Sequence, residues 1–271
     1  MNAMRALAEL SIEEAIARTE RAITHVGLGR AALATDGDGT LWTHDIGEAL
    51  FDAVLDAGLV GEPARAALVA EADAHGVVIS NRSDATAIAR ELFEAYVGLR
   101  FPEDRMCAAM SWCMAGVTTE VLDRFCAELL EGTFGLRHRL IAESNELLRY
   151  LSKRGVPVWL VSASPRAVVE AAAKVVAEIA GIDTPRVIAM TPRVVASTIA
   201  PATDGPWPYG EGKRAALEAE LDGRVLVAAM GDNAFDVAML RAARVPLAIR
   251  PKPALVHVAA DVPALMRLAT R

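Results

Sequence analysis

The sequence predicts an α/β protein, in which a doubly wound, Rossmann-like parallel sheet is interrupted once by an inserted all-helical domain. Two observations lead to this prediction. From Glu143 onward, helical segments alternate with short apolar runs, which is the order typical of a parallel sheet with crossover helices. Between residues 46 and 135, in contrast, several segments have helical periodicity and no convincing strand separates them.

The composition is that of a globular chain. Its 271 residues suffice for one large domain or two modest ones, and 53% of them are hydrophobic. The formal net charge of −7 argues against a nucleic-acid-binding surface, which needs a basic face. The first twenty residues lack an uninterrupted apolar core, and no stretch approaches about 18 uncharged apolar residues, so we expect neither a signal peptide nor a membrane span. Three cysteines without metal-binding spacing favour buried thiols and a cytoplasmic location.

The N-terminal half begins with a helix and a strand. Ser11 and Glu14 fit a capping box that predicts a helix running to about Thr24. Ala31–Thr35 is a short apolar run that predicts the first core strand. The insertion then contains four predicted helices, at residues 63–74, 84–99, 103–115 and 118–130. We therefore expect residues 1–44 and 136–271 to form the α/β core and residues 45–135 to form a helical cap.

The C-terminal half continues the alternation. A helix is predicted at residues 143–153 and a buried strand at 156–161, after which Pro165 opens the next helix with Ser164 as its N-cap. Further strands are predicted at residues 186–190, 225–230 and 246–249. Residues 201–212 are rich in proline and glycine, so we expect a loop that brings Lys213 to the carboxyl edge of the sheet.

Asp36 and Asp38 follow the first predicted strand directly. In an extended segment, side chains two residues apart point the same way, and two neighbouring carboxylates favour a bound cation. One can then act as a nucleophile and the other as an acid or base. A calcium loop is excluded, because Leu41 and Gly47 occupy the positions that need Gly and Glu. A surface Asp-Gly turn is the other alternative, but the apolar run leading into the pair favours the functional interpretation.

Three other polar positions follow predicted strands or open helices. Ser162 ends an apolar run, where a hydroxyl and backbone N–H groups suit a phosphate oxygen. Asp232 follows another strand and could ligate a metal, with Asp236 in support one helical turn later. Taken singly, Ser162 is an ordinary strand-end serine, Lys213 a surface charge and the aspartates a solvated turn. In a parallel sheet, however, ligands bind at the carboxyl ends of the strands, where all these residues are expected to meet.

With these residues in place, the chain resembles the haloacid dehalogenase-like (HAD) superfamily of hydrolases over nearly its whole length. Asp36, Asp38 and Thr40 match its D-x-D-x-T motif, Ser162 and Lys213 match its second and third motifs, and Gly231, Asp232 and Asp236 match its G-D-x-x-x-D motif. The insertion lies where the family's C1-type cap belongs. Three further segments are similar to the phosphoserine phosphatase-like branch: Ser162-Ala163-Ser164-Pro165, Tyr209-Gly210-Glu211-Gly212-Lys213 and Lys252-Pro253-Ala254-Leu255.

The resemblance implies a phosphatase that hydrolyses a small phosphomonoester through an aspartyl phosphate. In this interpretation Asp36 is the nucleophile, Asp38 protonates the leaving oxygen and then activates water, and Ser162 and Lys213 hold the phosphoryl oxygens. Asp36, the backbone carbonyl of Asp38 and Asp232 would bind Mg2+. The resemblance further implies supporting roles for Thr40, Asn233 and Asp236, and substrate contacts for Asp45, Gly39 and Ala163.

The substrate is less well indicated than the chemistry. The branch places a glutamate nine positions after the nucleophile, facing a substrate amino group; this chain has Asp45 there, which is equally suited to cap a helix. An amino compound such as phosphoserine is therefore a candidate. The alternatives are a phosphotransferase or mutase that uses the same aspartyl phosphate, and a non-catalytic binding protein. Gly37, Trp42 and His44 depart from the branch, and the cap side chains that could contact substrate are Arg82, Arg90, Arg100, Arg105, Tyr96 and Trp112.

Overall fold

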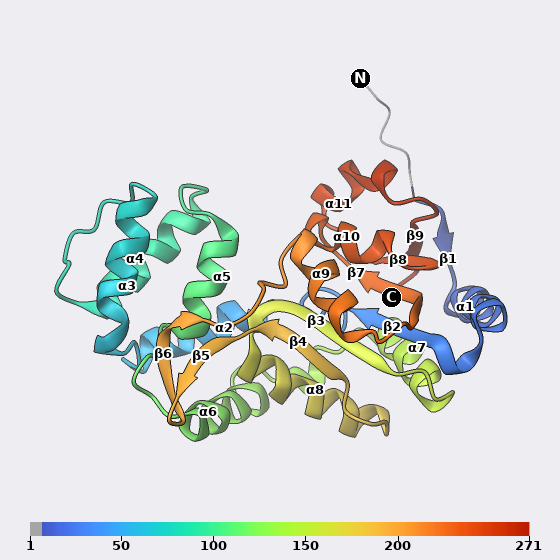
Figure 1. Ribbon diagram of the computed structural model, residues 1–271, viewed down its shortest axis with the longest axis horizontal. Helices are drawn as coiled ribbons and strands as arrows, with labels where there is room; N and C mark the ends of the chain where they lie inside the picture. The colour runs from blue at the N-terminus through green and yellow to red at the C-terminus, as the bar shows by residue number, and fades with distance from the viewer. Residues whose placement is uncertain (1–6, 271) are drawn as a thin grey trace.

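The protein is built on a parallel sheet of seven strands (Figure 1). The structure, a computed structural model, describes residues 7–270; residues 1–6 and 271, which belong to the predicted core and the segment searched for a signal peptide, lie outside this range. The order β1-β9-β8-β7-β2-β3-β4 places β2 and β7 side by side at the centre. Neighbouring strands pair in parallel throughout, which confirms the predicted doubly wound α/β fold.

The strands and helices of the described residues have the following bounds. The strands are β1 (Glu9–Leu10), β2 (Ala31–Thr35), β3 (Val158–Pro165), β4 (Arg186–Met190), β5 (Pro192–Val195), β6 (Thr198–Thr203), β7 (Val225–Gly231), β8 (Val245–Ile249) and β9 (Met266–Leu268). The helices are α1 (Ile12–Val26), α2 (Ile46–Asp56), α3 (Arg65–Ala74), α4 (Ala85–Val97), α5 (Glu103–Trp112), α6 (Thr119–Glu131), α7 (Ala142–Lys153), α8 (Arg166–Ala180), α9 (Glu211–Glu220), α10 (Val237–Arg241) and α11 (Pro253–His257).

Hydrophobic side chains cover both faces of the sheet. Successive residues of a strand point to opposite faces, so Leu33 and Leu160 join one cluster with α1, α7 and α8, whereas Ala32 and Trp159 join another with α9 and α10. The central strands are buried on both sides, which explains why they read as continuous apolar runs. Within the described residues, no helix combines the length and apolarity needed to cross a membrane.

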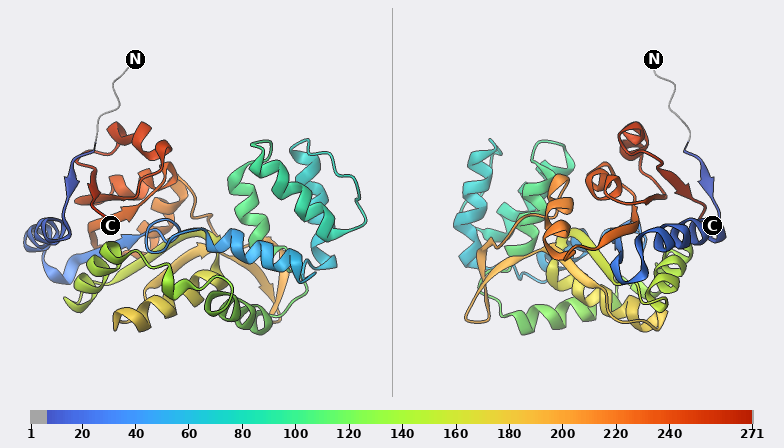
Figure 2. Two further views of the ribbon diagram at one scale, coloured as in Figure 1. Left: turned by 180° about the vertical axis from the view of Figure 1, so that it is seen from behind. Right: turned by 45° about the vertical axis from the view of Figure 1, so that its right-hand side comes forward.

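Helices α2 to α6 form the insertion, with α3, α4 and α5 beside the α/β core in Figure 1 and from behind in Figure 2. Their hydrophobic side chains belong to the same cluster as Leu33 and Leu160, so the insertion packs continuously onto the core. The division into a core and a cap at residues 45 and 135 stays a prediction.

A hairpin of β5 and β6 was not predicted from the sequence. It pairs antiparallel and packs against the insertion, because the N–H of Gly116 donates to the carbonyl of Ile199, and the N–H of Thr119 donates to that of Ser197. The first part of the predicted loop at 201–212 is therefore the end of β6. The hairpin gives the insertion a contact with a segment more than seventy residues away in sequence.

The predicted start of the helix after β3 is wrong by one residue. Pro165 is the last residue of β3 and precedes the first turn of α8, and no side chain caps this helix. Ser164 lies within β3, and its hydroxyl bonds to an aspartate instead of to the helix. Its side chain is therefore available to the site described next.

Candidate active site

One cavity collects most of the predicted site residues at the carboxyl ends of β2, β3 and β7. Its volume is about 70 Å³, and side chains from α2, α4 and α5 of the insertion form the opposite wall. The lining includes nine residues predicted from the sequence: Asp36, Asp38, Asp45, Ser162, Ala163, Lys213, Asp232, Asn233 and Asp236. The site therefore lies between the sheet edge and the insertion, where an open parallel sheet places its ligands.

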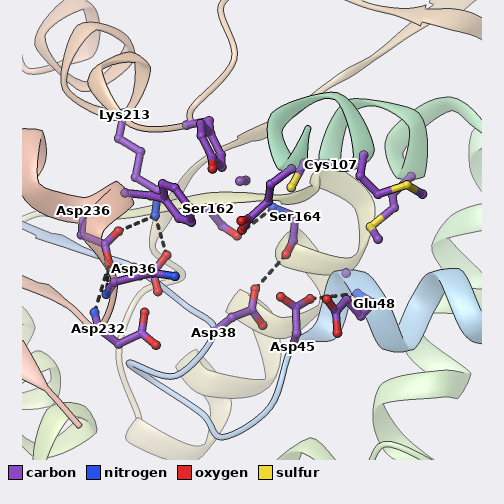
Figure 3. A pocket seen from close by; sticks show the side chains of 18 of the residues that line it. Asp36, Asp38, Asp45, Glu48, Cys107, Ser162, Ser164, Lys213, Asp232 and Asp236 are labelled. Carbon is purple, nitrogen blue, oxygen red and sulfur yellow. Dashed lines mark hydrogen bonds and ion pairs between the residues drawn. The ribbon is translucent and has the colours of Figure 1, made fainter. Parts of the chain in front are cut away.

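Asp36 and Lys213 form a buried ion pair at the base of the cavity (Figure 3). Lys213 Nζ lies 2.6 Å from Asp36 Oδ1 and 2.6 Å from Asp236 Oδ1, and the lysine is only 3% exposed. Burial raises the pKa of Asp36, Lys213 opposes this effect, and the neighbouring Asp236 and Asp232 add to it, so that the pKa is about 7. Burial opposes the charge of Lys213, but the two carboxylates outweigh it and raise the pKa of the ammonium.

Asp38 is held by three hydrogen-bond donors. Its Oδ1 accepts from the indole Nε1 of Trp42 and from the backbone N–H of Ile46, both at 2.8 Å. Its Oδ2 accepts from the hydroxyl of Ser164 at 2.7 Å. Burial, with the negative charges of Asp45 and Asp36, raises the pKa of Asp38 well above its usual range. This environment favours the protonated form of the Asp38 carboxyl group.

Trp42 explains the small first motif that the sequence analysis noted as a departure. A Cβ added to Gly37 would lie 2.6 Å from Cζ2 of Trp42, so the indole occupies the space that a larger residue would need. The same ring donates the hydrogen bond to Asp38, and it is fully buried. Glycine at position 37 and tryptophan at position 42 are thus one structural unit.

Asp236 holds the loop that carries Asp232. Its Oδ2 accepts from the backbone N–H groups of Asp232 at 3.0 Å and Asn233 at 2.9 Å, while its Oδ1 accepts from Lys213. A Cβ on Gly231 would lie 2.6 Å from the Cβ of Asp236, which accounts for the glycine that opens this motif. The geometry matches the predicted support by Asp236, because both of its oxygens already have protein partners.

Gly39 and Thr40 lie next to the cavity without being part of its lining. Gly39 has a φ of +78°, and a Cβ there would lie 2.2 Å from Oδ2 of Asp232, so this glycine makes room for the aspartate. Thr40 is fully buried and its carbonyl accepts a hydrogen bond from Ser144, whereas its hydroxyl has no partner among the described residues. Substrate contact by Gly39 and support by Thr40 stay predictions.

The donor set fits a small divalent cation. Oxygens of Asp36, Asp232 and Asp236 lie within 4.8 Å of one another, and carboxylate oxygens are the ligands that Mg2+ prefers. The negative charge of the three buried carboxylates exceeds the positive charge of Lys213, and glycine at position 39 avoids a clash between a Cβ and Oδ2 of Asp232. Both oxygens of Asp236 accept hydrogen bonds from the protein, whereas the contacts of Asp36 with Lys213 and of Asp232 with Lys252 involve one oxygen each, so Asp36 and Asp232 are the side chains that would hold the ion.

Ser162 lies in β3 and is 1% exposed. Its Oγ accepts a hydrogen bond of 3.0 Å from the backbone N–H of Ser164. Because a hydroxyl has one hydrogen and the acceptor side of Ser162 is used, that hydrogen is left to be donated, for example to a phosphoryl oxygen. The structure therefore brings the predicted phosphate ligand to the cavity with the required donor.

The wall formed by the insertion is acidic. Asp45, Glu48 and Glu103 line it, and burial raises the pKa of each. Asp45 also caps α2, because its Oδ1 accepts from the N–H of Glu48 at 2.8 Å, whereas its contact with substrate stays a prediction. Tyr96 lines the same wall and donates to Glu48 at 3.0 Å.

The other candidate side chains of the insertion lie elsewhere. None of the four arginines lines the cavity; Arg82 pairs with Asp73, and Arg105 pairs with Glu71 and stacks over Trp207. Trp112 is 5% exposed and belongs to the hydrophobic core. Within the described residues, the cations that line the cavity are Lys213 and Lys252.

Several lining residues have no role that the sequence predicts. Lys252 lies 3.1 Å from Oδ2 of Asp232, and its segment Lys252-Pro253-Ala254-Leu255 was noticed only as a resemblance. Ser164 was interpreted as a helix cap. Glu48 and Glu103 carry no local motif, because surface helices are rich in glutamate, and only the packing of α2 and α5 against the core brings them to the cavity.

Comparison with known proteins agrees with this fold. The family model described as haloacid dehalogenase-like hydrolase matches residues 33–241, which is more than half of the chain. The chain therefore belongs to the haloacid dehalogenase-like hydrolase family. No curated protein matches it.

Solved structures share the architecture at low sequence identity. A protein with unknown function from Bordetella pertussis Tohama I aligns with a TM-score of 0.66 and 20% identity, over 89% of this chain and 98% of that one. A functionally unknown protein from Anaerococcus prevotii DSM 20548 aligns with a TM-score of 0.60 and 16% identity, over 92% of this chain and 88% of that one. A probable phosphoserine phosphatase from Vibrio cholerae aligns with a TM-score of 0.53 and 17% identity, over 90% of this chain and 62% of that one. At these identities the likeness supports the fold alone.

Proposed function

We propose that the protein is a Mg2+-dependent phosphatase that hydrolyses a small phosphomonoester through an aspartyl phosphate on Asp36. The observation that carries the proposal is the arrangement of two aspartates in different environments. Asp36 is paired with Lys213, whereas Asp38 has only neutral donors and an environment that favours its protonated form. Environments that push the pKa values of two neighbouring carboxyl groups apart are typical of a nucleophile and an acid–base partner.

The reaction follows from these positions. The carboxylate of Asp36 bonds to phosphorus while the bond to the ester oxygen breaks, and Asp38 gives its proton to that oxygen, so that an alcohol leaves. The ionised Asp38 then takes a proton from water as the water oxygen attacks phosphorus. The bond to Asp36 breaks and inorganic phosphate is released. Ser162 and Lys213 donate to the phosphoryl oxygens, and Mg2+, when bound by Asp36 and Asp232, would offset the negative charge of the phosphoryl group.

Release of inorganic phosphate from a panel of phosphomonoesters, with Mg2+ and after its removal by a chelator, tests this proposal. We expect turnover that needs the metal and that falls below detection in Asp36→Asn. Asp183→Asn, an exposed change of the same type, serves as the control. Steady-state turnover by Asp36→Asn would contradict the nucleophile assignment. Transfer of phosphate to added glycerol in preference to water would favour a phosphotransferase.

The acidic wall supports a cationic leaving group. Glu48 and Glu103 face the cavity together with Asp45, and the rings of Tyr209 and Phe235, 4.4 Å apart between centroids, line it as well. Carboxylates attract an ammonium group, and aromatic faces add a cation–π attraction. Phosphoserine is a poorer fit than a phosphorylated amino alcohol, because its own carboxylate would meet this acidic wall, and the lining cations Lys213 and Lys252 are already paired with aspartates.

The relative kcat/KM for phosphoethanolamine, phosphocholine and phosphoserine tests the leaving group. We expect one of the first two to be the best substrate, and Glu103→Gln to lose activity toward it more than toward glycerol phosphate. Glu94→Gln, on the exposed side of α4, should change neither the activity toward the amino substrate nor the activity toward glycerol phosphate. A preference for phosphoserine, or an equal loss on charged and neutral leaving groups, would contradict the assignment while leaving the phosphatase proposal intact.

A further inference from the structure

Ser164 is a lining residue of the cavity to which the mechanism above gives no task. It lies at the end of β3, is 7% exposed, and donates its hydroxyl to Oδ2 of Asp38 (Figure 3). The two residues are 126 positions apart in sequence, so the contact depends on the pairing of β2 with β3. Ser164 therefore connects the second motif of the site to the proposed acid.

The bonding of Asp38 determines which of its oxygens can carry a proton. Oδ1 accepts from both Trp42 and Ile46, and these two donors occupy its lone pairs. Oδ2 accepts only from Ser164, so one lone pair of Oδ2 is left. A proton on Asp38 thus resides on Oδ2, in the direction that the Ser164 hydroxyl does not occupy.

We infer that Ser164 is a positioning residue for general acid–base catalysis: its hydroxyl fixes the orientation of Oδ2 so that the remaining lone pair, and the proton on it, face the substrate. This inference rests on the proposed function, in which Asp38 protonates the leaving oxygen. When Asp38 is ionised after the first step, the same hydroxyl donates to the new charge, and charged acceptors strengthen hydrogen bonds. Ser164 therefore acts through Asp38 in both steps.

Gly47 belongs to the same arrangement. A Cβ at this position would lie 2.8 Å from Oγ of Ser164 and 3.1 Å from its Cβ, so only glycine leaves the hydroxyl where it is. Gly47 lies in the first turn of α2 and has a negative φ, so nothing in its backbone conformation calls for glycine. The contact with Ser164 supplies the reason for a residue that helices otherwise disfavour.

The acidity of the leaving group provides a readout that a purely structural role would not change. Nitrophenolate leaves without a proton, whereas the less acidic phenolate needs the acid. We therefore propose to compare kcat/KM of Ser164→Ala with p-nitrophenyl phosphate and with phenyl phosphate, which are similar in shape. General acid catalysis contributes about 100- to 10,000-fold. If Ser164 supports part of this acid catalysis, Ser164→Ala should lose about tenfold or more kcat/KM on phenyl phosphate beyond its loss on p-nitrophenyl phosphate.

Two further variants make the test independent of folding. Gly47→Ala retains the serine but displaces its hydroxyl, and we expect the same selective loss with no decrease in melting temperature. Ser111→Ala, which removes a buried hydroxyl bonded to the carbonyl of Ala108 outside the cavity, should leave the ratio of the two substrates unchanged. Equal losses on both substrates in Ser164→Ala would overturn the positioning role. Absence of turnover by the unmodified protein would instead overturn the proposed function on which it rests.

Discussion

At the scale of single residues, the site depends on how buried charges are balanced. Lys213 is the counter-charge of both Asp36 and Asp236, and all three side chains are almost fully buried. Removal of one partner from such a group leaves an uncompensated charge, which is far more costly than the net value of the pair. The catalytic and structural roles of this lysine are therefore inseparable in a single substitution.

We predict that Lys213→Met lowers the free energy of unfolding by about 3–5 kcal/mol, because Asp36 and Asp236 lose their counter-charge. It should also lower kcat by about 100- to 1,000-fold, the range for removal of one electrostatic contact in a transition state. Denaturant unfolding and steady-state kinetics measure the two effects. Addition of Asp236→Asn should recover part of the stability and none of the activity. A double variant as unstable as Lys213→Met would contradict the charge argument.

Gly39 offers a comparison between steric and conformational effects. It and Gly205 have nearly the same φ, +78° and +75°, but only Gly39 has Asp232 at the place of a Cβ. We predict that Gly205→Ala costs about 1–2 kcal/mol of backbone strain and leaves activity unchanged. Gly39→Ala should have the same strain and in addition displace Asp232, with a lower apparent affinity for Mg2+ in kinetic titrations. Equal Mg2+ dependence in the two variants would show that Asp232 does not ligate the metal.

At the scale of elements, the first turn of α2 links helix stability to the acidic wall. Asp45 caps this helix and lines the cavity, and Gly47 and Glu48 follow in the same turn. The helix-capping role of Asp45 and its negative charge can be tested separately, because asparagine caps a helix as well as aspartate does. Asp84 provides the matched case, since it caps α4 through the N–H groups of Thr86 and Ala87 and lies outside the cavity.

We predict that Asp45→Ala and Asp84→Ala each lower the free energy of unfolding by about 1 kcal/mol, the usual value of a helix N-cap. Asp45→Asn should keep this stability and lose preference for cationic substrates. Thermal unfolding and relative kcat/KM across the substrate panel measure the two properties. If Asp45→Asn retains the preference of the unmodified protein, the selection of cations depends on Glu48 and Glu103 alone.

The elements also show how far the sequence determined the fold and the site. Strands β2 and β4 were predicted with their observed bounds, because short apolar runs bounded by turns leave few alternatives. The hairpin of β5 and β6 was missed, since its strands are buried at Ile199 alone and two prolines interrupt the apolar pattern. What stabilises it is packing against the insertion, and that contact has no local signature in the chain.

The site was predictable where the fold alone brings residues together. Asp36 and Asp232 follow β2 and β7, and Ser162 lies near the end of β3; these parallel strands are neighbours in the sheet, so the convergence of the three residues depends on topology. Tyr96 was only one of several cap candidates and Glu103 was not among them, because their place depends on which face of α4 and α5 packs toward the core. Ser164 was assigned to a helix because serine is favoured at N-caps, whereas here β3 extends through it. The roles assigned to the gathered residues stay predictions until the variants are measured.

At the scale of the whole molecule, the acidic wall predicts a pH-dependent stability. Burial raises the pKa of Glu103, Lys252 opposes this effect, and the negative charges of Asp45, Glu48 and Asp104 add to it. The folded protein therefore holds this proton more tightly than the unfolded chain does. Stability from this group is fully present below the unfolded pKa, about 4.3, and is lost as the pH rises through the raised folded value.

We predict that Glu103→Gln melts at a higher temperature than the unmodified protein at pH 7, because the neutral amide removes the buried charge. The difference should shrink as the pH is lowered and disappear near pH 4. Differential scanning calorimetry from pH 4 to pH 8 measures it, with Glu94→Gln as the exposed control. A difference that grows toward acid pH would mean that the Glu103 carboxylate is stabilised by the fold and that its pKa is lowered.

The contact between Gly37 and Trp42 has a consequence for how sequences of this kind can diverge. A larger side chain at position 37 has no space while the indole is present. A smaller residue at position 42 would create that space but remove a donor from Asp38. Neither position can drift alone, so the two are expected to be inherited as a pair. Among relatives of this chain, we expect glycine at the first site to occur with tryptophan at the second, and both to be replaced together or not at all.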